Sequence, residues 1–232
     1  MKKIPTLFER KFENHKIIGI TPELTKGLEY FFEGYYAAPD IFATIKWDGS
    51  CCAIRWEEGV EEPFTLYKRY DAKKGKPVPD KAIPCCDPDP ITGHQPCWMP
   101  CDRDNPADRW FWAAYDAYME AFKEGFIELE STKYWYKDHI QHIGGNWTHR
   151  INGASAQTFE AIGPHFQGNP YKLESDVLIP HGRDIIEVKK SFEDIKQYLT
   201  DNYIEGIVFW SSGDPICKIK RTDFGLEWNG RR

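Results

Sequence analysis

Short apolar runs separated by turn residues are the feature that most constrains the fold of this chain. Residues 41–49 (IFATIKWDG), 51–56 (CCAIRW) and 63–70 (PFTLYKRY) alternate loosely between apolar and polar, with turns at Gly49 and Gly59. Such alternation is typical of half-buried strands, and turn residues between the runs predict that the strands pair. Four later runs predict further strands: 156–163, 175–180, 205–210 and 215–220. We therefore expect an α+β fold with mostly antiparallel or mixed sheets and few helices.

Residues 104–125 (DNPADRWFWAAYDAYMEAFKEG) form the strongest helical pattern. Asn105 suits the N-cap, Pro106 suits the first turn, and Gly125 can end the helix. One apolar stripe is expected to face the core, made of Trp110, Ala114, Ala117, Tyr118 and Ala121. At this spacing, aromatic residues are typical of core packing rather than of a base-stacking platform.

A second helix is predicted over residues 191–199 (SFEDIKQYL), with Ser191 as its cap and Asp194 completing a capping box. Residues 73–106 are rich in Pro, Asp and Gly, which predicts one long loop. Loops of this length in compact domains are usually functional or disordered.

The length of 232 residues fits a single domain over 1–232, with residues 126–153 as a candidate insertion. The N-terminus has basic residues but no apolar run typical of a signal peptide, and no later run approaches a membrane span. We expect an intracellular, cytoplasmic protein without a membrane partner, and a monomer.

Intracellular compartments keep thiols reduced, so the seven cysteines, an odd number, argue against a disulfide framework. Five thiol and imidazole side chains crowd into one stretch and raise the alternative of zinc binding: Cys85, Cys86, His94, Cys97 and Cys101. A second CxxC pair, which would make the zinc pattern specific, is missing. Reduced structural or surface cysteines are the favoured interpretation.

The net charge of −6 lacks the basic surplus typical of nucleic-acid binding, but the charge is unevenly distributed. Residues 68–81 hold six Lys or Arg against two Asp, and residues 218–221 (KIKR) form a second basic cluster. Both segments are candidates for holding anionic groups.

Five short elements occur in one order along the chain. They are KWDGS at 46–50, KRYD at 68–71, TFEAIG at 158–163, EGIVFW at 205–210 and KIKR at 218–221. Alone, KWDGS favours the end of a strand running into a turn over a reactive lysine. In this order, the set resembles the covalent nucleotidyltransferases, which include ATP-dependent DNA and RNA ligases and capping guanylyltransferases. Longer stretches, such as KRYDAKKGK, EAIGPHFQGNPY and KIKRTDFGL, resemble the small stand-alone 5′-to-3′ RNA ligases.

The resemblance implies an ATP-grasp-like nucleotidyltransferase fold and a role for each matched residue. Lys46 would be the nucleophile, assisted by Lys218 and Lys220, which would lower the pKa of its amine and neutralise phosphate charge. Glu205 would be the magnesium ligand, since hard divalent ions prefer carboxylate oxygen. The remaining nucleotide contacts would come from Ile45, Asp48, Gly49, Arg69, Glu160, and Phe166 or Tyr171, with Glu160 on the ribose and an aromatic ring on adenine.

The implied reaction is ATP-dependent sealing of an RNA 5′-phosphate to an RNA 3′-hydroxyl through a lysyl-AMP and adenylylated RNA, with Mg²⁺ or Mn²⁺. The chain ends soon after Lys220, so we expect no C-terminal OB domain, which favours RNA over DNA ligation. Two alternatives stay open. One is a minimal DNA ligase or another nucleotidyltransferase, and the other is an RNA-end-binding module that has lost catalysis.

Overall fold

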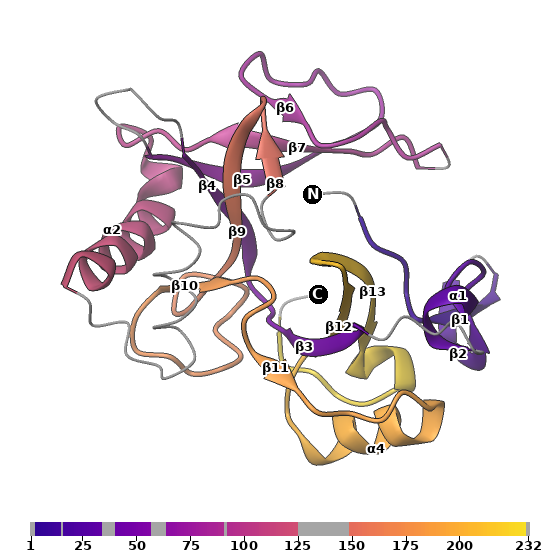
Figure 1. The fold of residues 1–232 in the computed structure, drawn as a ribbon. Helices are drawn as coiled ribbons and strands as arrows, with labels where there is room; N and C mark the ends of the chain where they lie inside the picture. The colour runs from indigo at the N-terminus through magenta and orange to yellow at the C-terminus, as the bar shows by residue number, and fades with distance from the viewer. Residues whose placement is uncertain are drawn as a thin grey trace. The chain divides into compact units, whose positions relative to one another are not determined.

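The computed structural model describes residues 3–14, 16–33, 40–56, 64–90, 92–124 and 149–230. The chain divides into two compact units, and each unit consists of two separate stretches of the chain. Unit 1 comprises 1–3 and 49–181, and unit 2 comprises 4–48 and 182–232. Figure 1 shows the elements of both. The sequence predicted one domain over 1–232, and this stays a prediction.

Unit 1 is built on a seven-stranded antiparallel sheet in the order β10-β9-β4-β5-β7-β6, with β8 also paired to β9. Its strands are β4 (Ser50–Trp56), β5 (Phe64–Ala72), β6 (Ile83–Pro84), β7 (Gln95–Pro100), β8 (His149–Ile151), β9 (Ala154–Ile162) and β10 (Val177–Pro180). The predicted strands at 51–56, 63–70, 156–163 and 175–180 are therefore confirmed.

One helix covers a face of this sheet. A short 3₁₀ turn, η1 (Pro106–Asp108), leads into α2 (Arg109–Glu124), and the Asn105 side chain accepts a hydrogen bond from the Ala107 amide at 3.0 Å. The predicted cap is thus confirmed. The sheet face beneath the helix is apolar, and its buried members include Cys52, Leu66, Phe159 and Leu178.

The predicted helix stripe was partly wrong. Ala114 is fully buried and Trp110 and Tyr118 pack on the core, but Ala117 is exposed. Phe111, Tyr115 and Met119 take part in the core instead. The stripe follows these larger apolar side chains because they bury more area than alanine.

Unit 2 contains a four-stranded sheet in the order β11-β3-β12-β13 and a separate β1-β2 hairpin. The elements are β1 (Phe8–Glu13), β2 (Lys16–Leu24), α1 (Glu29–Phe32), β3 (Phe42–Lys46), β11 (Ile185–Ile186), α4 (Phe192–Asp201), β12 (Gly206–Ser211), β13 (Asp214–Lys220) and η2 (Arg221–Phe224). The predicted helix at 191–199 is confirmed, and Ser191 Oγ accepts from the Asp194 amide at 3.1 Å. The strands predicted at 41–49, 205–210 and 215–220 are confirmed too.

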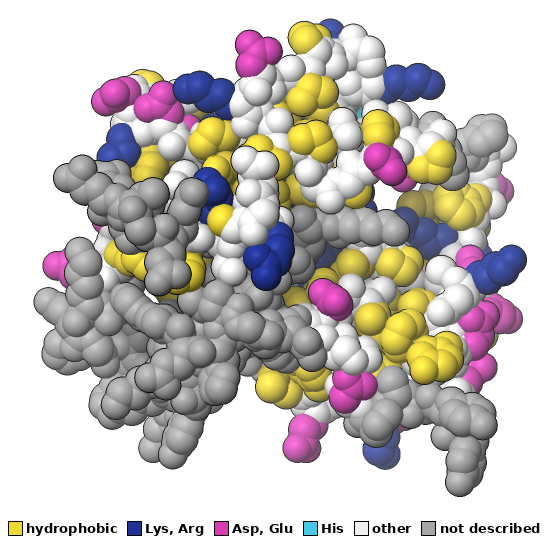
Figure 2. Space-filling view, turned by 45° about the horizontal axis from the view of Figure 1, so that its top comes forward, with side chains coloured by type: hydrophobic (Ala, Val, Ile, Leu, Met, Phe, Trp, Pro, Cys, Tyr) yellow, Lys and Arg dark blue, Asp and Glu magenta, His cyan; other side chains and the backbone are white. Residues whose placement is uncertain are grey.

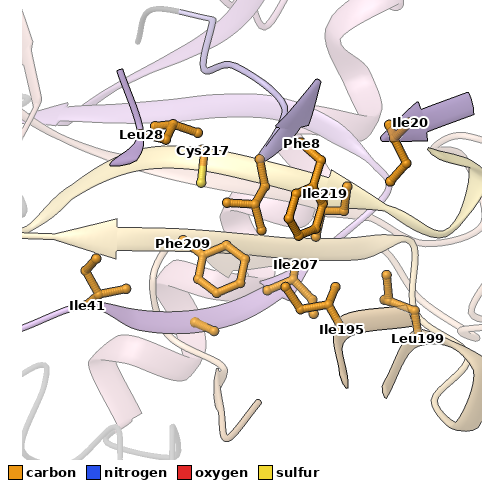
Figure 3. Close-up of a cluster of buried hydrophobic side chains, with 12 residues drawn as sticks. Phe8, Ile20, Leu28, Ile41, Ile195, Leu199, Ile207, Phe209, Cys217 and Ile219 are labelled. Carbon is orange, nitrogen blue, oxygen red and sulfur yellow. The ribbon is translucent and has the colours of Figure 1, made fainter. Parts of the chain in front are cut away.

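The core of unit 2 lies on one face of this sheet (Figure 3). Ile207 and Phe209 of β12 and Cys217 and Ile219 of β13 are fully buried there. The α4 side chains Ile195 and Leu199 pack against them, as do Phe8 and Ile20 from the N-terminal hairpin. The alternation of β12 and β13 leaves their other side chains on the opposite face of the sheet.

The predicted long loop at 73–106 was wrong in part, since it contains β6 and β7. The run QPCWMP escaped prediction because its prolines interrupt the alternation that marks a strand. Of the described residues, every strand pair within the named sheets is antiparallel, in agreement with the expected α+β class. No helix in the described ranges is long and apolar enough to cross a bilayer.

Three predictions fall outside the described residues: the turn at Gly59, the helix end at Gly125 and most of the candidate insertion at 126–153. The end of that insertion is described. Its residues 149–151 form β8, and Asn152 and Gly153 make the turn into β9 with positive φ values of 51° and 82°.

Candidate active site

A cluster of three lysines surrounds one carboxylate in unit 2. Lys46 Nζ donates to Glu205 Oε2 at 2.5 Å, and Lys220 Nζ donates to Glu205 Oε1. The Glu205 side chain is only 4% exposed, against 20% for Lys46 and 35% for Lys220. Both carboxylate oxygens therefore already bind an ammonium group.

Strand register explains why residues so distant in sequence meet. Gly206 pairs with Lys46 on β3 and with Lys220 on β13, so the three residues form one row across the sheet. Val208 similarly pairs with Lys218, which places Lys218 on the same face as Lys220. This face is opposite the core, so the sheet presents all three lysines away from its apolar side.

Gly206 is required by the close approach of the neighbouring strand. A Cβ atom at this position would lie 2.2 Å from the backbone oxygen of Ile219. The glycine of the Glu-Gly sequence thus permits the tight pairing of β12 and β13, directly beside Glu205.

Lys218 is half-buried, and its backbone is held by another segment of unit 2. Its backbone bonds to an N-terminal segment, because its amide donates to Pro5 O at 3.0 Å and its carbonyl accepts from the Leu7 amide at 2.7 Å. Burial, and then the charges of Lys46 and Lys220, lower the pKa of Lys218 from 10.5 to about 8. Burial and the neighbouring positive charges disfavour the charged form of Lys218, and a bound anion would offset this cost.

Asp48 follows Lys46 in the chain and lies in the same unit. Its Oδ2 accepts from Trp228 Nε1 at 2.7 Å, and burial, with a smaller contribution from Glu205, raises its pKa. Ile45 pairs with the core residue Ile207, so alternation puts it on the face away from Lys46. The Ile45 amide donates to Asp184 O at 3.0 Å.

A second polar cluster lies in unit 1, on the sheet face opposite α2. Glu160 of β9 pairs with Cys51 of β4, and its Oε1 accepts from the Gly49 amide at 3.1 Å. Its Oε2 lies 3.0 Å from His181 Nε2, while His181 Nδ1 lies 3.0 Å from the Thr158 hydroxyl. Glu160 is therefore oriented by a backbone amide on one side and an imidazole on the other.

Gly49 and Arg69 also have defined places in unit 1. A Cβ on Gly49 would lie 2.2 Å from Ala161 O, so the glycine is needed for the close approach of β9 rather than for a left-handed backbone. Arg69 of β5 is paired through Nε to Asp71 Oδ1 at 3.1 Å, and Lys3 contacts the other oxygen of that carboxylate at 3.1 Å.

The two aromatic candidates for the adenine contact differ. Phe166 is 4% exposed and packs edge-to-face on Phe111 in the core beneath α2, with ring centroids 5.1 Å apart. A ring so enclosed has no free face for a base, which argues against this half of the prediction. Tyr171 is half-buried in the segment between β9 and β10.

Several contacts escaped sequence reasoning. His181, just after the strand that pairs with β9, contacts Glu160, and Trp228 contacts Asp48, 180 positions before it in the chain. His165 forms a 2.6 Å contact to Asp176 and stacks on Trp110, which gives it a structural role. The available signal for His181 was the run LIPHG at 178–182, which is also similar to a segment of the small RNA ligases, but the run does not reveal the partner of His181.

All seven cysteines are free thiols. Within the described ranges, the Cys85–Cys101 stretch forms no group of three potential metal ligands. Cys51, Glu160 and His181 do form such a group. On the face seen in Figure 2, basic and acidic side chains are interspersed rather than separated into one large basic patch.

Comparison with known proteins gives a consistent result. A family model described as RNA ligase 1 matches residues 67–231, a range that includes Glu160, Glu205, Lys218 and Lys220 and begins after Lys46. The chain is 26% identical over 189 residues to RNA ligase 1 of Danio rerio, covering 73% of this chain and 49% of that protein. It is 27% identical over 192 residues to RNA ligase 1 of Mus musculus, again covering 73% and 49%. The chain thus spans about half the length of the curated relatives it matches.

Proposed function

Because this chain belongs to the RNA ligase 1 family, we propose that it is an ATP-dependent RNA ligase that joins a 5′-phosphate to a 3′-hydroxyl through a lysyl-AMP on Lys46. The observation that carries the proposal is the lysine cluster. Lys46, Lys218 and Lys220 share one face of a sheet around Glu205, as a site for a triphosphate requires. The antiparallel sheets and few helices are compatible with a nucleotidyltransferase fold, which is part of the proposal.

In the first step, Lys46 Nζ attacks the α-phosphorus of ATP. A phosphorus–nitrogen bond forms, the bond to pyrophosphate breaks, and the amine nitrogen loses its proton. Only a neutral amine has the electron pair for this attack. Glu205 Oε2, 2.5 Å from Nζ, is in place to accept the proton.

Lys218 and Lys220 would neutralise the charge that spreads over the phosphate oxygens. Phosphoryl transfer depends mainly on positioning and electrostatic stabilisation, so fixed cations beside the nucleophile contribute directly. The backbone of Lys218 is held by hydrogen bonds to Pro5 and Leu7, and the side chain of Lys220 is held by Glu205.

Glu160 and Arg69 would contact the nucleotide outside the triphosphate. A carboxylate only accepts hydrogen bonds, which suits the paired ribose hydroxyls. The Gly49 amide and His181 hold the Glu160 carboxylate in one orientation, and a held carboxylate loses less entropy on binding. Tyr171 is the remaining candidate for an adenine contact.

Glu205 offers the oxygen donors that Mg²⁺ or Mn²⁺ prefers, so the donor chemistry fits a divalent ion. Both oxygens bind lysines, and an ion would take one of these positions. When bound, Mg²⁺ would screen the negative charge of the triphosphate.

In the later steps, AMP would pass from Lys46 to the 5′-phosphate of RNA, forming a pyrophosphate linkage. The RNA 3′-hydroxyl would then attack the activated 5′-phosphorus, the new phosphodiester would form, and AMP would leave. ATP and RNA with these two ends are the proposed partners.

The test is labelling of the protein with α-radiolabelled ATP and Mg²⁺, together with intact mass measurement. We expect the wild type to gain one AMP, Lys46→Ala to gain none, and the control Lys196→Ala to label normally, since Lys196 is exposed on α4. Labelling of Lys46→Ala would show that Lys46 is not the nucleophile.

Joining assays separate the alternatives. A 5′-phosphorylated RNA oligonucleotide is expected to circularise or join with ATP, and the same DNA oligonucleotide to react poorly. Preference for DNA, or labelling by GTP alone, would indicate another nucleotidyltransferase. RNA-end binding without any label would indicate a module that has lost catalysis.

A further inference from the structure

Three side chains with metal-ligating atoms converge in unit 1. Cys51 Sγ, a Glu160 carboxylate oxygen and a His181 ring nitrogen all lie within 4.8 Å of one another. Cys51 and Glu160 are direct partners on the adjacent strands β4 and β9, and His181 follows β10 on the other side of β9. Three neighbouring segments of one sheet therefore fix the group.

The donor set is that of a borderline-soft ion. A thiolate, an imidazole and a carboxylate are the ligands that Zn²⁺ takes, commonly three protein ligands with a fourth position open. With ligand bonds of about 2.0–2.1 Å, nitrogen and oxygen around a tetrahedral ion lie about 3.3 Å apart. Glu160 Oε2 and His181 Nε2 are 3.0 Å apart, so a few tenths of an ångström of widening would admit the ion.

The surroundings already orient two of these ligands. His181 Nδ1 lies 3.0 Å from the buried Thr158 hydroxyl, which can accept a hydrogen bond from Nδ1–H and so leave the Nε2 electron pair available. Gly49 N–H donates to Glu160 Oε1, which leaves Oε2 for the ion. Partners of this kind orient ligands in established metal sites.

We propose that Cys51, Glu160 and His181 form a binding site for Zn²⁺ or a similar thiophilic divalent ion. On binding, the Cys51 thiol releases its proton to solvent and the sulfur coordinates the ion. An exchangeable ligand fills the fourth position. The site is distinct in residues and chemistry from Glu205, which offers oxygen only.

Occupation of this site regulates the protein, a consequence that rests on the proposed function. Glu160 is the proposed ribose contact, and it cannot accept from the ribose hydroxyls with an oxygen that coordinates zinc. Zn²⁺ at this site therefore competes with the nucleotide.

Cobalt binding tests the site directly, without any assay of ligation. Co²⁺ titrated into the full chain under reducing conditions is expected to give a thiolate-to-cobalt charge-transfer band at one equivalent, and Zn²⁺ to abolish it. Cys51→Ala should lose the band, and His181→Ala and Glu160→Gln should each weaken binding by about tenfold or more. The matched control is Cys52→Ala, since Cys52 is the next residue of β4 and is buried on the opposite face.

Retention of the full band in Cys51→Ala, or its equal loss in Cys52→Ala or Cys85→Ala, would overturn the assigned ligand set. Lack of any cobalt band in the wild type would overturn the site itself. In the labelling assay, Zn²⁺ should inhibit the wild type more strongly than Cys51→Ala. A wild type that never labels with ATP would refute the proposed function and leave the cobalt result standing.

Discussion

Replacing Lys218 by methionine should change how stability depends on pH. Burial and the charges of Lys46 and Lys220 lower the Lys218 pKa from 10.5 to about 8. This difference corresponds to about 3 kcal/mol of folding free energy, which the charged Lys218 costs the native protein. Methionine fills a similar volume and carries no charge, so the variant avoids this cost.

The sign follows from proton counts. Between pH 8 and 10.5 the unfolded chain keeps the Lys218 proton while the folded chain has lost it. Stability contributed by this residue therefore rises with pH across that window and is constant below it. The advantage of Lys218→Met over the wild type should be largest at pH 8 and below, and should shrink by about 3 kcal/mol as pH approaches 10.5.

Urea unfolding at a series of pH values from 7 to 10.5 measures this difference. Burial raises the pKa of several thiols, including that of Cys101 to about 12, so both proteins lose stability in alkali for another reason. Subtracting one curve from the other removes that shared effect. Lys196→Met, at an exposed position of α4, controls for the loss of a surface ammonium group. A difference curve for Lys218→Met that is flat across the window would refute the reasoning.

Three further predictions concern packing and charge. Gly206→Ala should lower stability by about 3 kcal/mol or prevent folding, since its Cβ would lie 2.2 Å from Ile219 O; thermal unfolding measures this. Asp108→Asn should cost about 3 kcal/mol in the free energy of unfolding, because Asp108 is 1% exposed and holds the ammonium of Lys68. Glu205→Gln should abolish labelling by ATP and cost about 2 kcal/mol of stability, since its partner lysines lose their counter-charge but are partly exposed.

Matched variants control these predictions. Gly75→Ala changes a glycine with no atom within 4 Å of the added Cβ, although its φ of 73° makes some loss expected. Asp116→Asn breaks an ion pair to Arg103 whose side chains are both more than half exposed, and should cost less than about 1 kcal/mol. Equal losses in Asp116→Asn and Asp108→Asn would contradict the weight given to burial. Normal labelling of Glu205→Gln by ATP would show that the Glu205 carboxylate is not needed for lysyl-AMP formation.

Local signals were the most reliable part of the sequence. Ser191 and Asn105 cap their helices as predicted, because a cap involves only residues two or three positions apart. The strand run at 205–210 needed no tertiary information either. The strand β7 was missed because its prolines interrupt the alternation, and the pairing with β5 that makes it a strand is not local. The exposed position of Ala117 was missed because it depends on which larger side chains face the sheet.

The sequence by itself determined the family of the chain and the short motifs from which the lysine cluster is assembled. It also determined where along the chain the strands that carry these motifs lie, because alternation and capping depend on residues close in sequence. Only the tertiary structure decided which of these side chains meet. Strand register put Lys46 and Lys220 on either side of Gly206, and the pairing of β10 with β9 brought His181 to Glu160. Pairing between distant strands depends on the whole sheet, so no single motif contains it.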